Sequence, residues 1–266
     1  RPAGEAAAPS LTDRPPPSAD AAMTDAILVL NAGSSSLKFS LFEVPDDEPV
    51  LVQRGQLDGL TTNTQFVAKG ADGAKVAEHG WYRALGHEGA MAYLVTHLRE
   101  TLASYTLRAV GHRVVHGGMR FAHPVRVDAA VVAYLETLVP LAPLHQPHNL
   151  APIRALLAHA PQMVQVACFD TSFHRAQPEL AQAFALPAEI IERGVRRYGF
   201  HGLSYEYIAN VLPGIDADAA GQDMALFGEL DRVADQVGQH LPQAARVANE
   251  AGGQEHVEVD HQVDAL

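Results

Sequence analysis

The chain has 266 residues, of which 47% are hydrophobic, so it can bury a sizeable core in one large domain or two ordinary ones. A formal net charge of −12 argues against broad binding to nucleic acids or anionic membranes, although a local basic pocket can still hold a phosphate. The single cysteine, Cys168, excludes an internal disulfide, and no apolar run reaches the length of a membrane span, so we expect a cytoplasmic protein.

Residues 1–25 are rich in proline and alanine and show no apolar periodicity. A segment of this composition buries too little apolar surface to fold, so we predict a disordered N-terminal extension. The first strand signal begins just after Met23. We therefore expect Met23 to be the natural start and the residues before it to be an over-extended reading or a tag.

A glycine, three hydroxyls and a lysine stand between two apolar runs in the segment NAGSSSLK, residues 31–38. The run before it, residues 27–30, is continuously apolar, as in a strand buried on both faces, whereas residues 37–41 alternate. The pattern predicts a strand, a tight turn and a second strand. Gly33 lets the backbone approach a ligand, and the amides, the hydroxyls and Lys38 suit a phosphate group. The alternative is a serine-rich hairpin that only turns the chain.

Strand and helix signals alternate up to about residue 212. Short apolar runs predict strands, and apolar residues repeated every three or four positions predict helices. Strands are expected at 50–52, 64–76 (as a hairpin around 70–73), 109–115 and 164–169, and helices at 86–103, 128–138, 150–158 and 204–211. Strands first and then alternating units indicate an α/β domain with a mixed central sheet over residues 26–220.

Arg113 lies where a predicted strand runs into a glycine pair, in the segment GHRVVHGG from Gly111. An arginine can hold a carboxylate or a phosphate through two parallel hydrogen bonds, and the glycines let the backbone come close to a ligand. The alternative is an arginine at the edge of the core that pairs with a carboxylate of the protein.

Two histidines, His145 and His148, lie in a segment that prolines stiffen into a loop, PLHQPHN. Their three-residue spacing is compatible with metal binding. Pro147 lies between them, however, and no thiolate is nearby, so we do not predict a zinc site.

Asp170 directly follows the apolar strand at 164–169, where a carboxylate commonly serves Mg²⁺ or substrate chemistry. A helix N-cap made by Asp170 or Thr171 is the alternative. His201 lies in the segment RRYGFHGLS, just before a predicted helix whose N-terminus favours anions, and this setting favours a ligand contact. A serine hydrolase is not expected, because the pattern Gly-x-Ser-x-Gly is missing around residues 34–36.

Five segments together resemble the acetate kinase family, within the acetate and sugar kinase, Hsp70 and actin superfamily. They are NAGSSSLKFSLF, GHRVVHGG, PLAPLHQPHNL, FDTSFH and RRYGFHGLSYEYI, in the order and near the spacing of the family. The resemblance implies an α/β fold with a mixed-sheet, ribonuclease H-like (actin-like ATPase) domain, whose second, duplicate domain is missing here. It also implies Mg²⁺-dependent transfer of the γ-phosphoryl group of ATP to acetate, which yields acetyl phosphate and ADP.

The resemblance further implies roles for individual residues. Four residues match positions around the transferring phosphate of ATP: Asn31, Ser34, Ser36 and Lys38. Asn31 also matches a magnesium position, which in the family works with a late glutamate that this chain lacks.

The same comparison assigns the acceptor side. Three residues match catalytic positions: Arg113 would bind the acetate carboxylate or the phosphoryl oxygens, His201 would stabilise the transition state, and Asp170 would lie near metal and substrate. The other matched substrate-binding residues are a loop histidine and three residues that line a small apolar pocket for the acetate methyl: His145, and Val115, Leu144 and Phe200.

The resemblance ends at about residue 220. Residues 221–266 contain nine acidic residues, two arginines and no lysine, and they lack the nucleotide-binding segments of the family. We expect this divergent acidic tail, from a truncated or frame-shifted gene, to be disordered or to form one helix. Without the nucleotide half, little or no kinase turnover is expected. The family forms homodimers, and much of that contact comes from the half that is missing here.

Two other functions stay open. One is a non-catalytic half-domain that binds an anion. The other is a propionate or butyrate kinase, because an extra methylene changes the energy of a pocket by only about 1–3 kcal/mol.

Overall fold

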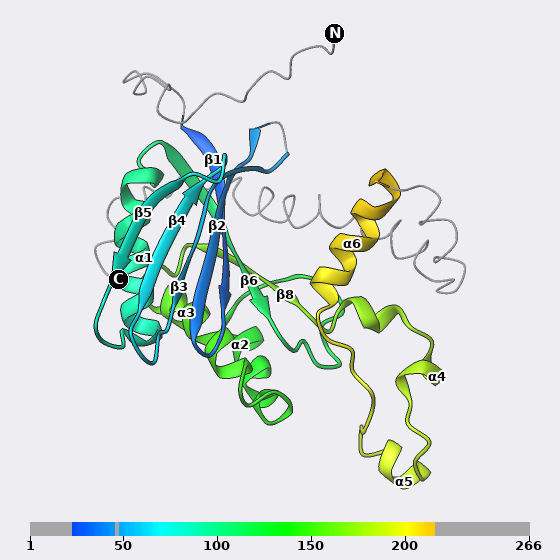
Figure 1. The fold of residues 1–266 in the computed structure, drawn as a ribbon. Helices are drawn as coiled ribbons and strands as arrows, with labels where there is room; N and C mark the ends of the chain where they lie inside the picture. The colour runs from blue at the N-terminus through cyan, green and yellow to red at the C-terminus, as the bar shows by residue number, and fades with distance from the viewer. Residues whose placement is uncertain (1–22, 46–47, 216–266) are drawn as a thin grey trace. The chain divides into compact units, whose positions relative to one another are not determined.

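The computed structural model describes residues 23–45 and 48–215 (Figure 1). The predictions for residues 1–22 and 221–266 lie outside the described residues. The chain divides into two compact units, whose boundary falls between Val110 and Gly111. Strand β6 (Tyr105–Val114) contributes residues to both units.

The first unit is built on strands in the order β5-β4-β3-β2-β1-β6. Neighbours from β1 to β5 pair antiparallel. Both predicted hairpins, around 31–38 and 70–73, are confirmed. Strand β3 runs well past the predicted 50–52, because its polar residues pair through the backbone with strands on both sides. The bounds are Thr24–Ala32 for β1, Ser36–Glu43 for β2, Val50–Asp58 for β3, Gln65–Gly70 for β4 and Lys75–Gly80 for β5.

Strand β1 is buried on one face only. Leu28 and Leu30 are buried, whereas Val29 between them is 38% exposed. The prediction that residues 27–30 form a strand buried on both faces is therefore wrong. Strands in an antiparallel sheet can face solvent on one side, since their backbone groups are satisfied by their neighbours in the sheet.

Helix α1 (Gly86–Leu102) confirms the helix predicted at 86–103. Its buried residues recur at helical spacing: Ala90, Met91, Leu94 and Leu98. Phe66 of β4 packs edge-on against Tyr93 and His97 of this helix, with ring centroids 5.0 and 4.7 Å away. The helix thus covers the apolar face of the first unit.

The second unit packs two helices against a short part of the sheet, in which the order is β6-β8-β7. Strand β8 (Val164–Phe169) is antiparallel to β7 (Val125–Arg126). Helices α2 (Ala129–Thr137) and α3 (Gln146–His159) lie side by side, joined through the 3-10 turn η3 (Val139–Leu141). The core between these elements includes the fully buried side chains of Val114, Leu135, Leu150, Ile153, Ala167 and Phe169.

Helix α3 begins at Gln146, so the prediction of a loop through residue 149 is wrong. Pro147 lies in the first helical turn, where the N–H that proline lacks has no partner in the helix and where its φ suits the helix. His145 therefore precedes the helix as its N-cap residue, and His148 lies in the first turn.

Three short helical elements and one longer helix complete the second unit. They are η4 (Phe173–Ala176), α4 (Glu179–Gln182), α5 (Ala188–Ile191) and α6 (Gly202–Ile215). Helix α6 confirms the one predicted at 204–211. Within residues 23–45 and 48–215, no helix is both long enough and apolar enough to cross a membrane.

Candidate active site

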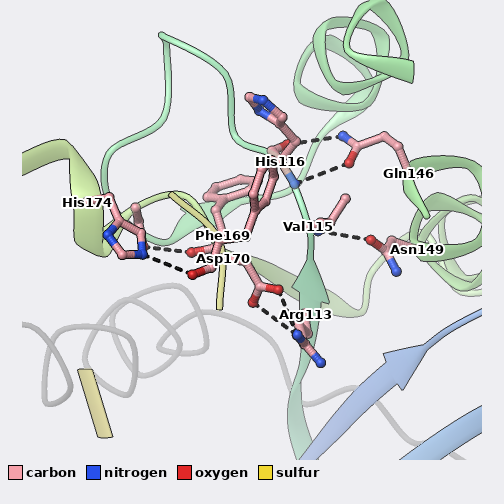
Figure 2. A network of polar contacts seen from close by, with 10 residues as sticks. Arg113, Val115, His116, Gln146, Asn149, Phe169, Asp170 and His174 are labelled. Atoms are coloured by element: carbon pink, nitrogen blue, oxygen red, sulfur yellow. Dashed lines mark hydrogen bonds and ion pairs between the residues drawn. The ribbon is translucent and has the colours of Figure 1, made fainter. Parts of the chain in front are cut away.

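Arg113 and Asp170 form a bidentate ion pair at the ends of β6 and β8 (Figure 2). The Arg113 Nε donates to Asp170 Oδ1 at 2.9 Å, and Nη2 donates to Oδ2 at 2.7 Å. The Asp170 side chain is 3% exposed and that of Arg113 36%. Hydrogen bonding to Asp170 is the main reason why the pKa of Arg113 is raised.

The ion pair bears on the alternative roles that the sequence leaves open for Arg113 and Asp170. Arg113 does pair with a carboxylate of the protein, but that carboxylate belongs to another predicted site residue. The N-cap alternative for Asp170 or Thr171 is wrong, because the next helical turn, η4, is preceded by Ser172 and has no side-chain cap. The Thr171 hydroxyl instead accepts the backbone N–H of Gly117 at 3.1 Å.

The backbone of Asp170 joins three of the predicted segments. Its N–H donates to the carbonyl of Val114 at 3.0 Å, and its carbonyl accepts the N–H of Gly202 at 2.8 Å. A Cβ at position 202 would collide with that carbonyl, so the contact requires glycine. These two bonds tie the segments that carry Arg113, Asp170 and His201 to one another, since Val114 follows Arg113 and His201 precedes Gly202.

His201 is exposed and has a φ of 59°, the only positive φ of a non-glycine residue in the described structure. A left-handed conformation costs a non-glycine residue about 1–3 kcal/mol, and such strain is concentrated at functional sites. The His201 carbonyl accepts the N–H groups of Ser204 and Tyr205, which starts helix α6. His201 therefore lies directly before the N-terminus of helix α6, a position that favours anions.

The glycine pair serves packing. Gly117 and Gly118 are buried. A Cβ on Gly117 would lie 2.8 Å from the Phe169 ring, and a Cβ on Gly118, whose φ is 63°, would collide with the Tyr134 hydroxyl. Packing therefore requires glycine at both positions, because the chain itself fills the space that a Cβ would take. That the backbone approaches a ligand here stays a prediction.

His116 connects the glycine segment with the segment before α6. Its Nδ1 accepts the Gly118 N–H at 2.8 Å, and its ring packs against Tyr198 and Phe200, with centroids 4.4 and 5.8 Å away. Burial lowers its pKa, which favours the neutral ring that this hydrogen bond requires.

Two amide side chains that the sequence argument missed hold the backbone after Arg113 (Figure 2). Gln146 accepts the N–H of His116 at 3.2 Å and donates to its carbonyl at 3.0 Å. Asn149, one turn further along α3, accepts the N–H of Val115 at 2.9 Å. The amides take the place of a neighbouring strand beyond the end of β6. The signal in the sequence is a glutamine and an asparagine three residues apart, a spacing that puts both side chains on one face of a helix.

Gln146→Leu is expected to lower the free energy of unfolding by about 2 kcal/mol, because it leaves the buried N–H and carbonyl of His116 without their partner. Urea unfolding followed by circular dichroism measures the loss. Gln162→Leu is the matched control, since Gln162 is exposed and its replacement should change stability by less than about 0.5 kcal/mol. Equal effects of the two variants would contradict the role given to Gln146.

The residues predicted to line an apolar pocket are not enclosed in the described structure. Leu144 is 72% exposed and Phe200 37%, while Val115 is partly buried. His145 is exposed as well. The contact of these side chains with a substrate stays a prediction.

The predicted phosphate loop lies in the first unit and turns tightly. The Gly33 N–H donates to the Ser36 carbonyl at 2.8 Å, and the carbonyls of Gly33 and Ser35 bond to His87 Nε2 at 2.6 Å and to the Leu60 N–H at 3.0 Å. Asn31 lies directly across from Lys38 in the register of β1 and β2.

The register sorts the loop residues by face. Asn31, Ser36 and Lys38 share one face of the hairpin, because opposed residues share a face and side chains alternate along a strand. Ala32 and Leu37 point to the other face and are buried. Ser34 is exposed at the tip. The hairpin thus presents polar groups together, as a phosphate site requires.

Oxygen ligands for a metal are sparse. The described residues contain no group of three or more His, Cys, Asp or Glu side chains placed to hold a metal ion. Both carboxylate oxygens of Asp170 already accept from Arg113. The Asn31 amide oxygen fits Mg²⁺ chemistry, but only as one ligand of an ion held mainly by substrate phosphates.

Comparisons with known proteins identify the family of this chain. The Acetokinase family model matches residues 26–220. The acetate kinase of Rhodopseudomonas palustris (strain TIE-1) is 48% identical over 205 residues, which are 76% of this chain and 50% of that protein. The acetate kinase of Rhizobium meliloti is 46% identical over 199 residues, 74% of this chain and 50% of that protein.

Solved structures give the same result for the fold. A propionate kinase from Francisella tularensis matches with a TM-score of 0.62 at 33% identity, over 72% of this chain and 49% of that chain. Porphyromonas gingivalis acetate kinase matches with a TM-score of 0.61, also at 33% identity, over 72% and 49%. The predicted α/β, actin-like fold with a mixed sheet is thereby confirmed. The chain spans about half the length of the relatives it matches, and it belongs to the acetokinase family.

Proposed function

We propose that this chain provides the acceptor side of an ATP-dependent phosphoryl transfer to acetate. The observation that carries the proposal is the Arg113–Asp170 ion pair, which is positioned by the backbone of three segments and leaves Nη1 of Arg113 outside the pair. A guanidinium fixed by a buried carboxylate is well suited to hold an anion in one orientation.

The proposed reaction requires only positions and charges from the protein. One carboxylate oxygen of acetate attacks the γ-phosphorus of ATP, and the bond from that phosphorus to the β–γ bridging oxygen breaks, which releases ADP. Arg113 orients the acetate carboxylate or the phosphoryl oxygens, and His201 stabilises the charge on the transferring group. Asp170 holds Arg113 in place. A covalent intermediate on the protein is not needed.

The hairpin of β1 and β2 is proposed to hold the phosphates of ATP. Ser34, Ser36 and Lys38 supply hydroxyl donors and a positive charge, and Asn31 supplies an amide. Mg²⁺ bound to these phosphates would neutralise part of their charge, with the Asn31 oxygen as the ligand from this chain. A cytoplasmic location and a homodimer follow from the family and stay predictions.

Acetyl phosphate formation from ATP, Mg²⁺ and acetate, trapped with hydroxylamine, tests the proposal. Arg113→Ala is expected to abolish both acetate binding, measured by calorimetry, and any turnover. Arg154→Ala is the control, because Arg154 forms an exposed ion pair with Glu136 away from the proposed site. Acetate binding that survives in Arg113→Ala would overturn the proposal.

Acetate binding without turnover would favour the second candidate, a non-catalytic anion-binding module. This candidate is favoured by the observation that the chain spans only about half the length of the kinases it matches. Propionate is the competing acceptor, because Leu144 and Phe200 are exposed and one of the matching structures is a propionate kinase. One methylene changes the binding energy by about 1–3 kcal/mol, so parallel titrations with the two acids distinguish them.

A further inference from the structure

Two arginines that take no part in the proposed reaction lie close together in the second unit. Arg175 comes from η4, and Arg196 from the segment before α6. Both donate through Nη1 to the sulfur of Met119, Arg175 at 3.2 Å. Both also donate to Oε1 of Gln182, at 3.5 Å from Arg175 Nη1 and 2.9 Å from Arg196 Nη2. Two positive side chains thus converge on one amide oxygen and one thioether.

The acceptors are fewer than the donors. Each guanidinium carries five N–H groups, whereas the partners found here are one amide oxygen and one sulfur, a weak acceptor. The Nε atoms of Arg175 and Arg196 are buried and have no hydrogen-bond partner within the described part of the chain. Among the same residues, neither arginine forms an ion pair with a carboxylate. The cluster therefore has an excess of positive charge and of donors.

Gln182 holds the cluster in a defined geometry. Its side chain is largely buried, and its Nε2 donates to the carbonyls of Gln177 and Arg175. The backbone carbonyl of Gln182 accepts the backbone N–H of Arg197 at 2.9 Å. The two bonds made by Nε2 leave Oε1 facing the guanidiniums, so the amide connects the two arginines and keeps them close together.

We propose that Arg175, Arg196, Gln182 and Met119 form a binding site for a phosphate-type dianion. Two like charges held together repel one another, and an anion with several oxygens between them would remove this repulsion and occupy the donors that have no partner. Two guanidiniums match a doubly charged phosphate better than a singly charged carboxylate. Met119 is the replaceable partner, because its flexible side chain is 49% exposed and its sulfur binds N–H groups weakly.

The site shares no residue with the proposed acetate site, so it is an additional place where a free phosphate or the phosphate of a larger metabolite can bind. Inorganic phosphate is the probe, added to the ¹⁵N-labelled chain while the Nε–H resonances of Arg175 and Arg196 are followed by NMR. These two resonances report on this cluster, which separates it from any phosphate held by the β1–β2 hairpin. A saturable shift of both resonances is expected, with acetate binding at least about tenfold more weakly.

Substitutions locate the effect. Arg175→Gln and Arg196→Gln should each weaken phosphate binding about tenfold or more, and Arg193→Gln, at an exposed arginine of the same unit, should leave it within about twofold. Met119→Glu places a carboxylate between the arginines, so it should abolish phosphate binding and raise the midpoint of thermal unfolding without phosphate. Met119→Leu supplies no charge and should keep phosphate binding.

The variants Met119→Glu and Met119→Leu still test the proposal if an arginine variant does not fold. Phosphate binding that survives in Met119→Glu would overturn the proposal. The same holds if the wild-type Nε–H resonances do not shift or do not saturate with phosphate, or if acetate binds as tightly as phosphate.

Discussion

Arg113→Ala is expected to lower the free energy of unfolding at neutral pH by about 3 kcal/mol. The Asp170 side chain is 3% exposed, so the variant leaves a carboxylate buried without its cation, which is the most expensive way to break an ion pair. Arg113 is 36% exposed, and solvent screening places the loss at the lower end of the range for buried pairs. Urea unfolding of the two proteins measures the difference.

Two comparisons separate the ion pair from a general loss of packing. Arg154→Ala removes an exposed pair, in which both side chains are nearly half exposed, and should cost less than about 1 kcal/mol. The double variant Arg113→Ala/Asp170→Ala removes the stranded carboxylate as well, so it should be more stable than Arg113→Ala alone. A double variant that is less stable than either single variant would show that the pairing does not control stability.

A loss of about 3 kcal/mol is expected from His112 when the pH falls from 6.5 to 4. Burial lowers the pKa of His112 to about 4, and the neighbouring Gln165 opposes this shift only in part. Above pH 6.5 the ring is neutral in both the folded and the unfolded chain, so its contribution is fully present. As the pH falls towards 4, the unfolded chain takes up a proton that the folded chain does not, and folding is disfavoured. The buried His116 acts in the same direction.

His112→Leu should therefore reduce the slope of stability against pH between pH 6.5 and 4, as measured by urea unfolding at several pH values. Val114→Ala is the matched control. Val114 is fully buried two residues away on the same strand, so its loss should lower stability by a similar amount at every pH without changing the slope. Equal slopes for the wild type and His112→Leu would refute the assignment.

Most of the secondary structure could be predicted from local pattern. Helix α1 followed from apolar residues at three- and four-residue spacing, and the hairpins of β1–β2 and β4–β5 followed from glycine-containing turns between apolar runs. The exceptions depended on context. Helix α3 starts earlier than the local pattern predicts, because Pro147 indicates a loop by residue type although proline is tolerated in the first turn of a helix.

The site was predictable as a set of residue types and only partly as a geometry. The segments around Arg113, Asp170 and His201 predict each of these residues as part of a site. The first two residues bind each other across 57 positions of the chain. The backbone of Asp170 holds Gly202, at the start of α6, across 32 positions. No local pattern contains such a contact.

The sequence by itself determined the α/β class, the order of the elements and the resemblance of five segments to one family, because periodicity and short motifs are local properties of a chain. Only the tertiary structure decided that Gln146 and Asn149 hold the end of β6, that Gly117 and Gly118 serve packing, and that Arg175 and Arg196 converge on Gln182. The physical reason is that buried polar groups must find partners, and those partners are chosen by which elements meet in space.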